Sequence, residues 1–346
     1  MNKKKPKVLV VATSQKTRGG ITSVLKAHQL GPQWHEYHCK WIETHRDKNR
    51  VIKLLYFFRA FFIYMYSLPS CDLVHIHTSQ PTSVVRKIPF MALAKFFKKK
   101  TIVHLHATIS EKEQPIYRYL FKQADRILVL ADVFRTSINQ TYHLGEKIQV
   151  LYNPCDEPAE RLKYNKQKNI LSAGTISPLK GYVDLINAFA KIANRYPEWT
   201  IVFAGVGEIE RAKMLAETLG IVRQIVFLGW ISGEEKNKAF QEASIFCLPS
   251  YTEGFPMAVL DAWAYQLPVI TTPVGGLVDI LKDEENTLVF EPGDVDKLAT
   301  QLERMIADNV LRTRIEKASQ HLAEVTFNRD EINTQLRGIY SKMIQE

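Results

Sequence analysis

The stretch PSYTEGFPMAVLDAWAYQLPVI, residues 249–270, does most to decide the fold and the site. Glu253 follows an apolar run of strand type and precedes a helix predicted from Met257 to Tyr265, which carries Asp261. The two acids stand eight positions apart, just over two helical turns, so their carboxylates are expected to face the same way. A strand, a Gly-Phe-Pro turn and a helix start beside two acids suit a nucleotide-linked polar ligand, because helix-start amides hold phosphate and carboxylates hold hydroxyls.

Length and composition are those of a globular protein. The chain has 346 residues, of which 46% are hydrophobic and 24% are charged. This length and this hydrophobic content are enough for two domains with their own cores. The four cysteines are scattered without a C-x-x-C pair, which indicates a reduced cytosolic protein. The N-terminus, MNKKKPKVLVVAT, has only a short apolar run and predicts a first strand, not a signal peptide.

The net charge of +10 is unevenly distributed along the chain. Residues 1–170 hold 29 Lys and Arg against 12 Asp and Glu, whereas residues 171–346 hold 17 against 24. The two halves are therefore expected to meet different partners. Nucleic acid and an anionic membrane surface are both candidates for the basic half. We expect no nucleic-acid partner, because no groove-reading or base-stacking motif is present.

Short apolar runs alternate with helix-length amphipathic stretches from end to end. This pattern predicts an α/β fold with two doubly wound Rossmann-like domains facing across a cleft, with ligands at the carboxyl ends of the strands. A polar stretch at 154–169 interrupts it, so we expect domains at 1–160 and 161–325, and a helix at 326–346 that packs back on the first domain. The predicted strands are KVLVVAT, DLVHIH, TIVHLHA, RILVL, IQVLY, NILSAG, TIVFAG, IVFLG, IFCLP and PVITT.

Two further strand-to-helix loops suit a phosphate group. Gly19 and Gly20 follow the first strand and precede a helix predicted over Ile21–His28, where glycine lets backbone amides approach an anion. Lys180 precedes another helix and can reach a diphosphate. The simpler alternative for the glycine pair is a tight turn, and the simpler alternative for Lys180 is a solvated lysine that binds no anion. The Gly-x-Gly of FAGVGE lacks the spacing of a dinucleotide fingerprint, so hydride-transfer chemistry is poorly supported.

Four histidines fall on two predicted strands: His75, His77, His104 and His106. Within each strand the two side chains point to one face, so the four could converge on a metal. Because the sequence offers no acidic cluster nearby, we favour histidines that line a cleft or bond to the backbone, and we expect no metal. His106, the last before a polar loop, is best placed to face a ligand.

The pair Asp294 and Asp296 formally matches a D-x-D metal motif. It follows Pro292-Gly293 and opens a helix predicted over Lys297–Ile306. An N-cap aspartate explains the motif without a metal.

Two aromatic segments, residues 53–66 and 85–100, stand out in the basic half. The first is too short to span a bilayer and contains Arg59; the second ends in three lysines. Both could lie on an anionic membrane interface, and two buried helices with solvated ends are the alternative. One side of the first segment is expected to form a core stripe: Leu54, Leu55, Phe58, Phe62 and Met65.

Taken together, these motifs resemble those of retaining glycosyltransferases of family 4, which have the GT-B fold. The resemblance covers nearly the whole chain, and residues 249–281 look like the family's E-x7-E segment. The Gly-Gly loop, VHIH, HLHA, VLYNP, GTISPLKG and VFLGW occur in the family's order. Such an ordered series is far more specific than any one motif.

The resemblance implies roles for individual residues. Glu253 and His106 would act at the donor sugar, Lys180 would neutralise the diphosphate, and Asp261 would bind the ribose hydroxyls. The family needs no metal or other cofactor, and the departing phosphate takes the acceptor's proton during same-face attack. The implied donor-binding residues are Gly19, Gly20, Lys180, Gly229, Trp230, Ile231, Gly254, Phe255, Pro256, Met257 and Asp261.

Three departures from the family pattern matter. Thr175 stands where arginine is usual, so one cationic contact is missing or is supplied by another residue such as Arg18. Asp261 stands where glutamate is usual, which shortens that side chain by one methylene. Gln266 stands where glycine commonly precedes the next strand, which indicates a changed turn.

These features predict a retaining glycosyltransferase that moves a hexose from a nucleotide sugar, UDP-linked, to a growing lipid-linked surface glycan. We expect it in the cytoplasm, peripheral at the inner face of the membrane. The alternatives are a nucleotide-sugar epimerase or phosphorylase of the same fold, and an inactive sugar-nucleotide-binding subunit.

Overall fold

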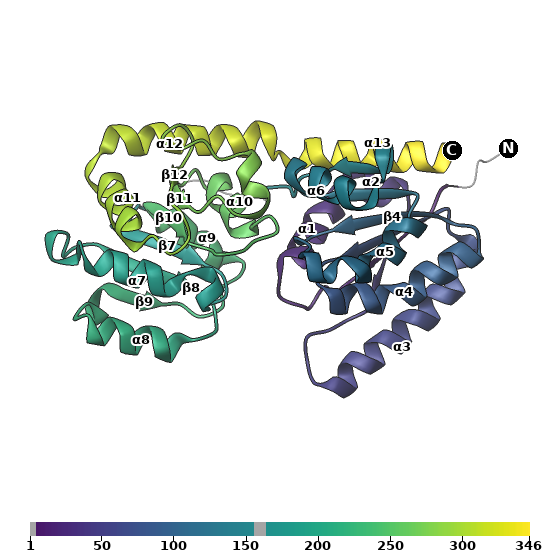
Figure 1. Cartoon of the computed structure of the whole chain (residues 1–346), viewed down its shortest axis with the longest axis horizontal. Coiled ribbons are helices and arrows are strands. Elements are labelled where there is room, and N and C mark those ends of the chain that lie inside the picture. The colour runs from purple at the N-terminus through teal and green to yellow at the C-terminus, as the bar shows by residue number, and fades with distance from the viewer. Residues whose placement is uncertain (1–4, 156–163) are drawn as a thin grey trace. The chain divides into compact units, whose positions relative to one another are not determined.

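The computed structural model describes residues 5–155 and 164–346. The chain forms two compact units: an N-terminal unit of Met1–Pro154 with Arg329–Glu346, and a C-terminal unit of Cys155–Asn328. Each unit is a parallel six-stranded sheet with helices on both faces (Figure 1). The fold is therefore α/β with two doubly wound Rossmann-like domains, as predicted. The domain boundary predicted at residue 160 lies outside the described residues, and the cleft between the domains stays a prediction.

The N-terminal sheet has the strand order β2-β1-β3-β4-β5-β6. The direction of winding reverses between β1 and β3, and ligands of doubly wound sheets bind at such a switch point. The strands are β1 (Val8–Ala12), β2 (Lys40–Glu43), β3 (Leu73–Thr78), β4 (Lys100–Leu105), β5 (Arg126–Val129) and β6 (Ile148–Val150). The helices are α1 (Gly20–Gln29), α2 (Pro32–Glu36), α3 (Arg50–Ser67), α4 (Pro81–Phe96), α5 (Gln114–Gln123), α6 (Asp132–Tyr142) and α13 (Arg329–Gln345).

The C-terminal sheet has the order β12-β11-β10-β7-β8-β9, which is the order of dinucleotide-binding Rossmann sheets. Its switch point lies between β7 and β10. The strands are β7 (Asn169–Ala173), β8 (Thr200–Ala204), β9 (Ile225–Phe227), β10 (Ile245–Leu248), β11 (Val269–Thr271) and β12 (Leu288–Val289). The helices are α7 (Tyr182–Ala190), α8 (Ile209–Thr218), α9 (Glu234–Glu242), α10 (Met257–Ala264), α11 (Val295–Ala307) and α12 (Asn309–His321).

All ten predicted strands are present, and the described residues contain two more that sequence analysis missed, both at the edge of a sheet. Strand β2, with the sequence KWIE, is only partly buried, and β12 has two residues. An edge strand lacks one neighbour, so it needs less apolar sequence than a central strand. Central strands such as β1 and β3 are buried at every position, which is why their sequences are recognisable.

The predicted core stripe of the first aromatic segment is wrong, because α3 turns its opposite side to the protein. The buried residues of α3 are Ala60, Tyr64 and Ser67, and the Tyr64 hydroxyl donates a 2.9 Å hydrogen bond to the carbonyl of Phe90 on α4. The small side chain of Ala60 and the hydroxyls of Tyr64 and Ser67 let α3 pack closely against α4 and β2. The exposed stripe of α3 consists of Leu54, Leu55, Phe58, Phe62 and Met65, which are 41–62% exposed.

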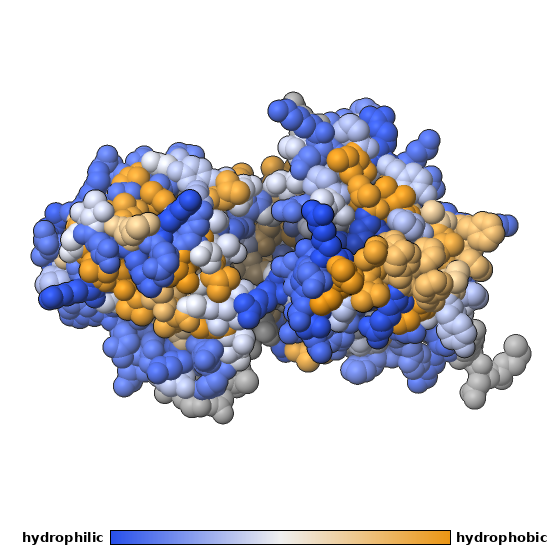
Figure 2. Space-filling model, turned by 90° about the horizontal axis from the view of Figure 1, so that it is seen from below, coloured by the Kyte–Doolittle hydropathy of each residue, from blue (hydrophilic) through white to orange (hydrophobic). Residues whose placement is uncertain are grey.

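The prediction that this segment is too short to span a bilayer is also corrected. Asn49 caps α3 by accepting a 3.0 Å hydrogen bond from the amide of Ile52, so the helix begins before residue 53. With the following turn it forms Arg50–Ser70, which is long and apolar enough to cross a membrane by length and composition alone. Its buried contacts nevertheless hold α3 on the N-terminal unit, where Figure 2 shows a broad apolar surface.

Helix α13, the last element of the chain, completes the N-terminal core. Its apolar side joins the cluster formed by β1, β3 and β4, through residues that include Leu336 and Tyr340. Asn333 lies at a buried junction with the first two helices. Its Oδ1 accepts hydrogen bonds from Gln33 Nε2 at 2.7 Å and from His28 Nδ1 at 2.8 Å. In Figure 1 this helix lies beside α2.

The Asn333→Ala variant is expected to have a lower free energy of unfolding than the wild-type protein. It leaves the buried donors of Gln33 and His28 without their acceptor, at a cost of about 1–3 kcal/mol for each group. The exposed Lys342→Ala variant on the same helix is the control. Urea unfolding of both proteins measures the difference, and equal stabilities would contradict this role of Asn333.

Candidate functional site

Two loops meet at the switch point of the C-terminal sheet, and they bring together two of the predicted site residues. Lys180 ends a short helical turn after β7, and Glu253 lies in the loop after β10. The Lys180 ammonium contacts Glu253 Oε1 at 2.6 Å, and the Ser250 hydroxyl donates to the same oxygen at 2.7 Å. The Glu253 side chain is 9% exposed and that of Lys180 is 30% exposed, so the cation faces solvent more than its partner does.

Two glycines allow these loops to approach one another. Gly181 has a φ of 71°, and a Cβ there would lie 1.9 Å from the carbonyl oxygen of Pro249. Gly275 has a φ of 62°, and a Cβ there would lie 2.3 Å from the carbonyl oxygen of Glu253. The backbone must therefore carry no side chain at either position, since L residues with a Cβ rarely adopt this conformation.

A small pocket lies beside Lys180, at the carboxyl ends of β7 and β8. This is where ligands bind in doubly wound sheets. Thr175, where the sequence resemblance implied an arginine, is part of the wall, and Lys180 is the only cation among the lining residues. The pocket is lined by Ser172, Ala173, Gly174, Thr175, Ile176, Lys180, Tyr182, Phe203 and Leu248.

The predicted common orientation of the two acids is not supported, because only Asp261 lies on α10. Glu253 belongs to the preceding loop, where Gly254 and Pro256 delay the start of the helix to Met257. Helical spacing therefore does not relate the two carboxylates. Asp261 pairs instead with Lys236 at 2.7 Å. Sequence analysis missed Lys236, because it is one of several charged residues on the polar helix α9.

The other predicted donor residues of this unit have different environments. Phe255 is buried with its ring 5.3 Å from that of Phe327, which indicates a packing role. Pro256 is also buried, and Gly254 and Met257 are half-buried. The loop after β9 contains Gly229, Trp230 and Ile231, and the Trp230 side chain is 42% exposed. Because β9 is two strands from β7, this loop begins about 10 Å to the side of the Lys180 loop.

The changed turn predicted at Gln266 is not found at the end of α10, because Gln266 keeps the conformation that a glycine would adopt. Gln266 has a φ of 57°, and its amide donates to the carbonyl of Trp263 at 2.9 Å. This left-handed conformation after a helix is the one that glycine adopts most readily.

The predicted glycine loop of the N-terminal unit lies at that unit's own switch point. Helix α1 begins at Gly20, and Gly19 before it is exposed with a φ of 143°. A Cβ at Gly19 would meet nothing within 4 Å, so the helix start is open. Ten residues of helix with an open N-terminus can hold an anion.

His106 lies directly after β4 in the N-terminal unit, where its ring contacts that of His77. Its Nε2 atom lies 2.9 Å from Nδ1 of His77, and its amide donates to the carbonyl of Thr78 at 2.8 Å. Burial, followed by the charge of His28, lowers the pKa of His106 to about 3. The ring is therefore neutral at physiological pH, and it can accept or donate a hydrogen bond but carries no charge.

The D-x-D motif has the structural explanation expected for it. Asp294 accepts a 2.8 Å hydrogen bond from the amide of Lys297 and caps α11, while Asp296 pairs with Lys191.

Comparison with known proteins agrees with this architecture. Residues 156–322 match the family model of glycosyl transferases group 1, which covers nearly half of the chain. An uncharacterised glycosyltransferase of Haemophilus influenzae is 26% identical over 58% of this chain and 57% of its own length. The capsular polysaccharide biosynthesis glycosyltransferase CapM of Staphylococcus aureus is 27% identical over 58% of this chain and 53% of its own length. The chain thus spans about half the length of these relatives.

A solved structure extends the similarity to both units. The Anabaena protein HepE, in complex with UDP-glucose, superposes with a TM-score of 0.77 over 97% of this chain and 99% of its own, at 17% identity. The fold of this chain is therefore GT-B, as the sequence resemblance implied, and its C-terminal unit carries the pattern of glycosyl transferases group 1.

Gly275→Ala is expected to disturb the site, whereas Gly220→Ala is a matched control. Both positions have positive φ, so each alanine costs about 1–2 kcal/mol of strain, but a Cβ at Gly220 meets nothing within 4 Å. Only the Gly275 variant must displace the Glu253 carbonyl. Thermal unfolding is expected to show a larger loss for Gly275→Ala, and equal losses would contradict the close approach.

Proposed function

We propose that the protein is a retaining glycosyltransferase that moves a hexose from a nucleotide sugar to an acceptor glycan. The observation that carries this proposal is the Lys180–Glu253 pair at the switch point of the C-terminal sheet. It lies within the residues that match the group 1 glycosyltransferase model. A solvent-facing cation beside a largely buried carboxylate suits a ligand with a diphosphate next to a sugar.

The leaving group of this reaction is a nucleoside diphosphate, whose negative charge grows as the sugar departs. The Lys180 ammonium has three N–H donors, so it can bond a phosphate oxygen while it keeps its contact with Glu253. Fixed donors of this kind stabilise the transition state without reorganisation. Glu253 orients the sugar, Asp261 binds the ribose hydroxyls, and the departing phosphate takes the acceptor's proton from the same face.

The donor is proposed to be a UDP-hexose and the acceptor a surface glycan. HepE has been solved in complex with UDP-glucose, and relatives are named for capsular polysaccharide and lipopolysaccharide core biosynthesis. The reaction is proposed to need no metal or other cofactor, because Lys180 and the helix starts supply the positive charge that a metal would otherwise provide.

A second candidate is a sugar-nucleotide-binding subunit without activity, and the observation that favours it is Thr175 in the pocket wall, which leaves Lys180 as its one cation. An epimerase of the same fold is a third. Incubation of the nucleotide sugar without acceptor distinguishes them: an epimerase converts the sugar alone, and a binding subunit leaves it unchanged with or without acceptor.

The acceptor is proposed to be carried on a membrane lipid at the cytoplasmic face. The exposed stripe of α3 forms an apolar surface on the N-terminal unit, together with Val85 and Phe96 on α4, which are 56% and 79% exposed (Figure 2). The exposed bases Arg59 and Lys98 lie on or directly after the same two helices. Apolar side chains next to bases suit the interface of an anionic membrane, where each base contributes about 1 kcal/mol.

Lys180→Ala is expected to lower turnover by about 100- to 1000-fold, the effect of removing one transition-state donor. Lys191→Ala removes a more exposed lysine from the same unit and is the control. Release of UDP from UDP-glucose in the presence of membrane lipid extract measures the rate. A Lys180 variant as active as the control would overturn the proposed site.

The Leu54→Glu/Phe62→Glu variant is expected to lose membrane binding by at least about tenfold, because each apolar side chain contributes about 1.5–3 kcal/mol when it leaves water. Val310→Glu changes a side chain that is 82% exposed on α12 and is the control. Sedimentation with phosphatidylglycerol vesicles at low salt measures binding. The membrane proposal fails if the wild-type protein stays in solution, or if the α3 variant sediments as the control does.

A further inference from the structure

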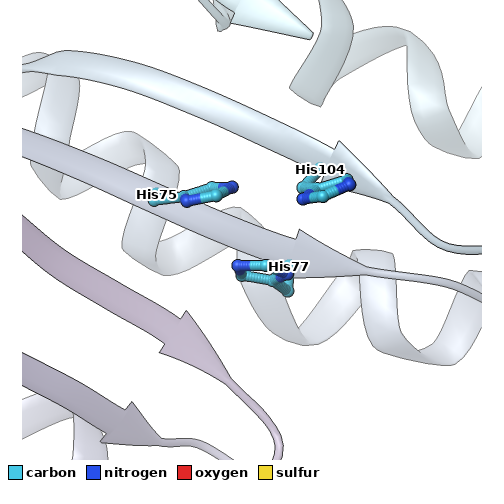
Figure 3. A group of neighbouring side chains, drawn as sticks. All are labelled: His75, His77 and His104. Atoms are coloured by element: carbon cyan, nitrogen blue, oxygen red, sulfur yellow. The ribbon is translucent and has the colours of Figure 1, made fainter. Parts of the chain in front are cut away.

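Three buried histidines of the N-terminal sheet form a compact group that glycosyl transfer does not use. His75 and His77 lie two residues apart on β3 and therefore point to one face, and His104 on β4 is the register partner of His77. The ring centroids are 4.2 Å apart for His75 and His77, 5.0 Å for His77 and His104, and 5.5 Å for His75 and His104. Figure 3 shows the three side chains close together on two neighbouring strands.

Several ring nitrogens in this group lack a partner. Within residues 5–155 and 164–346, the Nε2 atoms of His75 and His77 and both ring nitrogens of His104 are buried without a hydrogen bond. A neutral imidazole has one N–H donor and one lone pair, and a buried polar group without a partner costs about 1–3 kcal/mol. One nitrogen of each ring lies within 4.8 Å of the others. A single ligand that accepts one lone pair from each ring would therefore satisfy one nitrogen of each histidine.

The other nitrogens of two rings are already held. His75 Nδ1 lies 2.7 Å from the hydroxyl of Tyr340, and His77 Nδ1 lies 2.9 Å from Nε2 of His106. Both rings are thus fixed through Nδ1 and leave Nε2 for another partner. Histidines that bind metals are oriented in this way, with the second nitrogen bonded to a neighbouring group.

We propose that His75, His77 and His104 bind one divalent transition-metal ion, of which Zn²⁺ is the best match, as a structural site of the N-terminal unit. Three histidines are an established zinc ligand set, with Zn–N distances of about 2.0–2.1 Å. Nitrogens around one tetrahedral ion lie about 3.4 Å apart, so the three donors, which now lie within 4.8 Å of one another, would have to turn and move closer to bind it. A water is the fourth ligand, and its ionisation to hydroxide would reduce the buried charge from +2 to +1.

The donor chemistry selects the class of ion. The group that the described residues form contains only histidines, and imidazole nitrogen suits zinc, cobalt, nickel and copper, whereas magnesium and calcium prefer oxygen. Sequence analysis predicted no metal because no acidic cluster lies nearby. In the structure Tyr340 and His106 orient the rings of His75 and His77, a role that carboxylates often have.

The site would tie three elements together. His75 and His77 belong to β3, His104 belongs to β4, and Tyr340 belongs to α13. An ion that binds the folded N-terminal unit and not the unfolded chain stabilises that unit by mass action. The proposed reaction assigns no step to His75, His77 or His104, so a negative result of the metal titration would leave the proposed function untouched, and the reverse also holds.

The test is titration of tag-free, chelator-treated protein with Co²⁺, followed by visible absorption. We expect one Co²⁺ per chain with the strong absorption of tetrahedral nitrogen ligation, displacement by one equivalent of Zn²⁺, no effect of Mg²⁺, and a higher melting temperature with Zn²⁺. Because the wild-type protein is used, this readout does not depend on the folding of any variant. The absence of stoichiometric Co²⁺ binding would overturn the proposal.

Two variants and one control locate the ion. His104→Gln removes a ligand, and Tyr340→Phe removes only the partner of His75 Nδ1. Loss of an orienting partner weakens metal binding by about 10- to 100-fold, and loss of a ligand weakens it further. His35→Ala removes an exposed imidazole from the same unit and is expected to bind Co²⁺ as the wild type does. Unchanged binding by folded His104→Gln protein would place the ion elsewhere and contradict the proposal.

Discussion

The ion pair between Lys180 and Glu253 is the constraint on which the C-terminal site depends. A carboxylate that is 9% exposed needs a partner, because an uncompensated buried charge is strongly destabilising. Lys180 and Ser250 provide that compensation from the two loops that flank the switch point. The pair therefore fixes the loop after β7 against the loop after β10, and Gly181 and Gly275 supply the space in which the two backbones meet. A bound diphosphate would share the lysine and keep this arrangement.

The sequence predicted the parts of the fold that local patterns determine. Central strands such as β1, with VLVVA, are apolar throughout, and the Lys180 loop and the Asp294 cap follow from residue type and position. The edge strand β2 was missed, because KWIE is half-exposed and its pattern is weak. The partner of Asp261 was missed for a different reason: Lys236 is 25 residues away, and only the packing of α9 against the sheet brings it near.

Helix α3 shows why composition alone cannot identify the buried side of a helix. Apolar residues lie on all sides of α3, so the sequence alone predicts that the longest apolar stripe is buried. The structure instead buries Ala60 and Tyr64 and exposes that stripe. Close packing needs a small residue and a hydrogen-bonded hydroxyl more than it needs bulk. The N-terminal sheet also has polar residues on the face that α13 covers. Along β3, Val74 and Ile76 alternate with His75 and His77, and His75 contacts Tyr340 of α13. The N-terminal unit thus combines an apolar exterior with a polar buried layer.

The most direct test of the central claim is a thermal-stability screen of nucleotide sugars, run in parallel on the wild-type protein and on Lys180→Ala. A ligand at 100 times its dissociation constant stabilises the folded state by about 2.7 kcal/mol. The account predicts that a UDP-hexose raises the melting temperature of the wild-type protein and has little effect on the variant. It is contradicted if no nucleotide sugar stabilises the wild-type protein, or if the variant is stabilised equally.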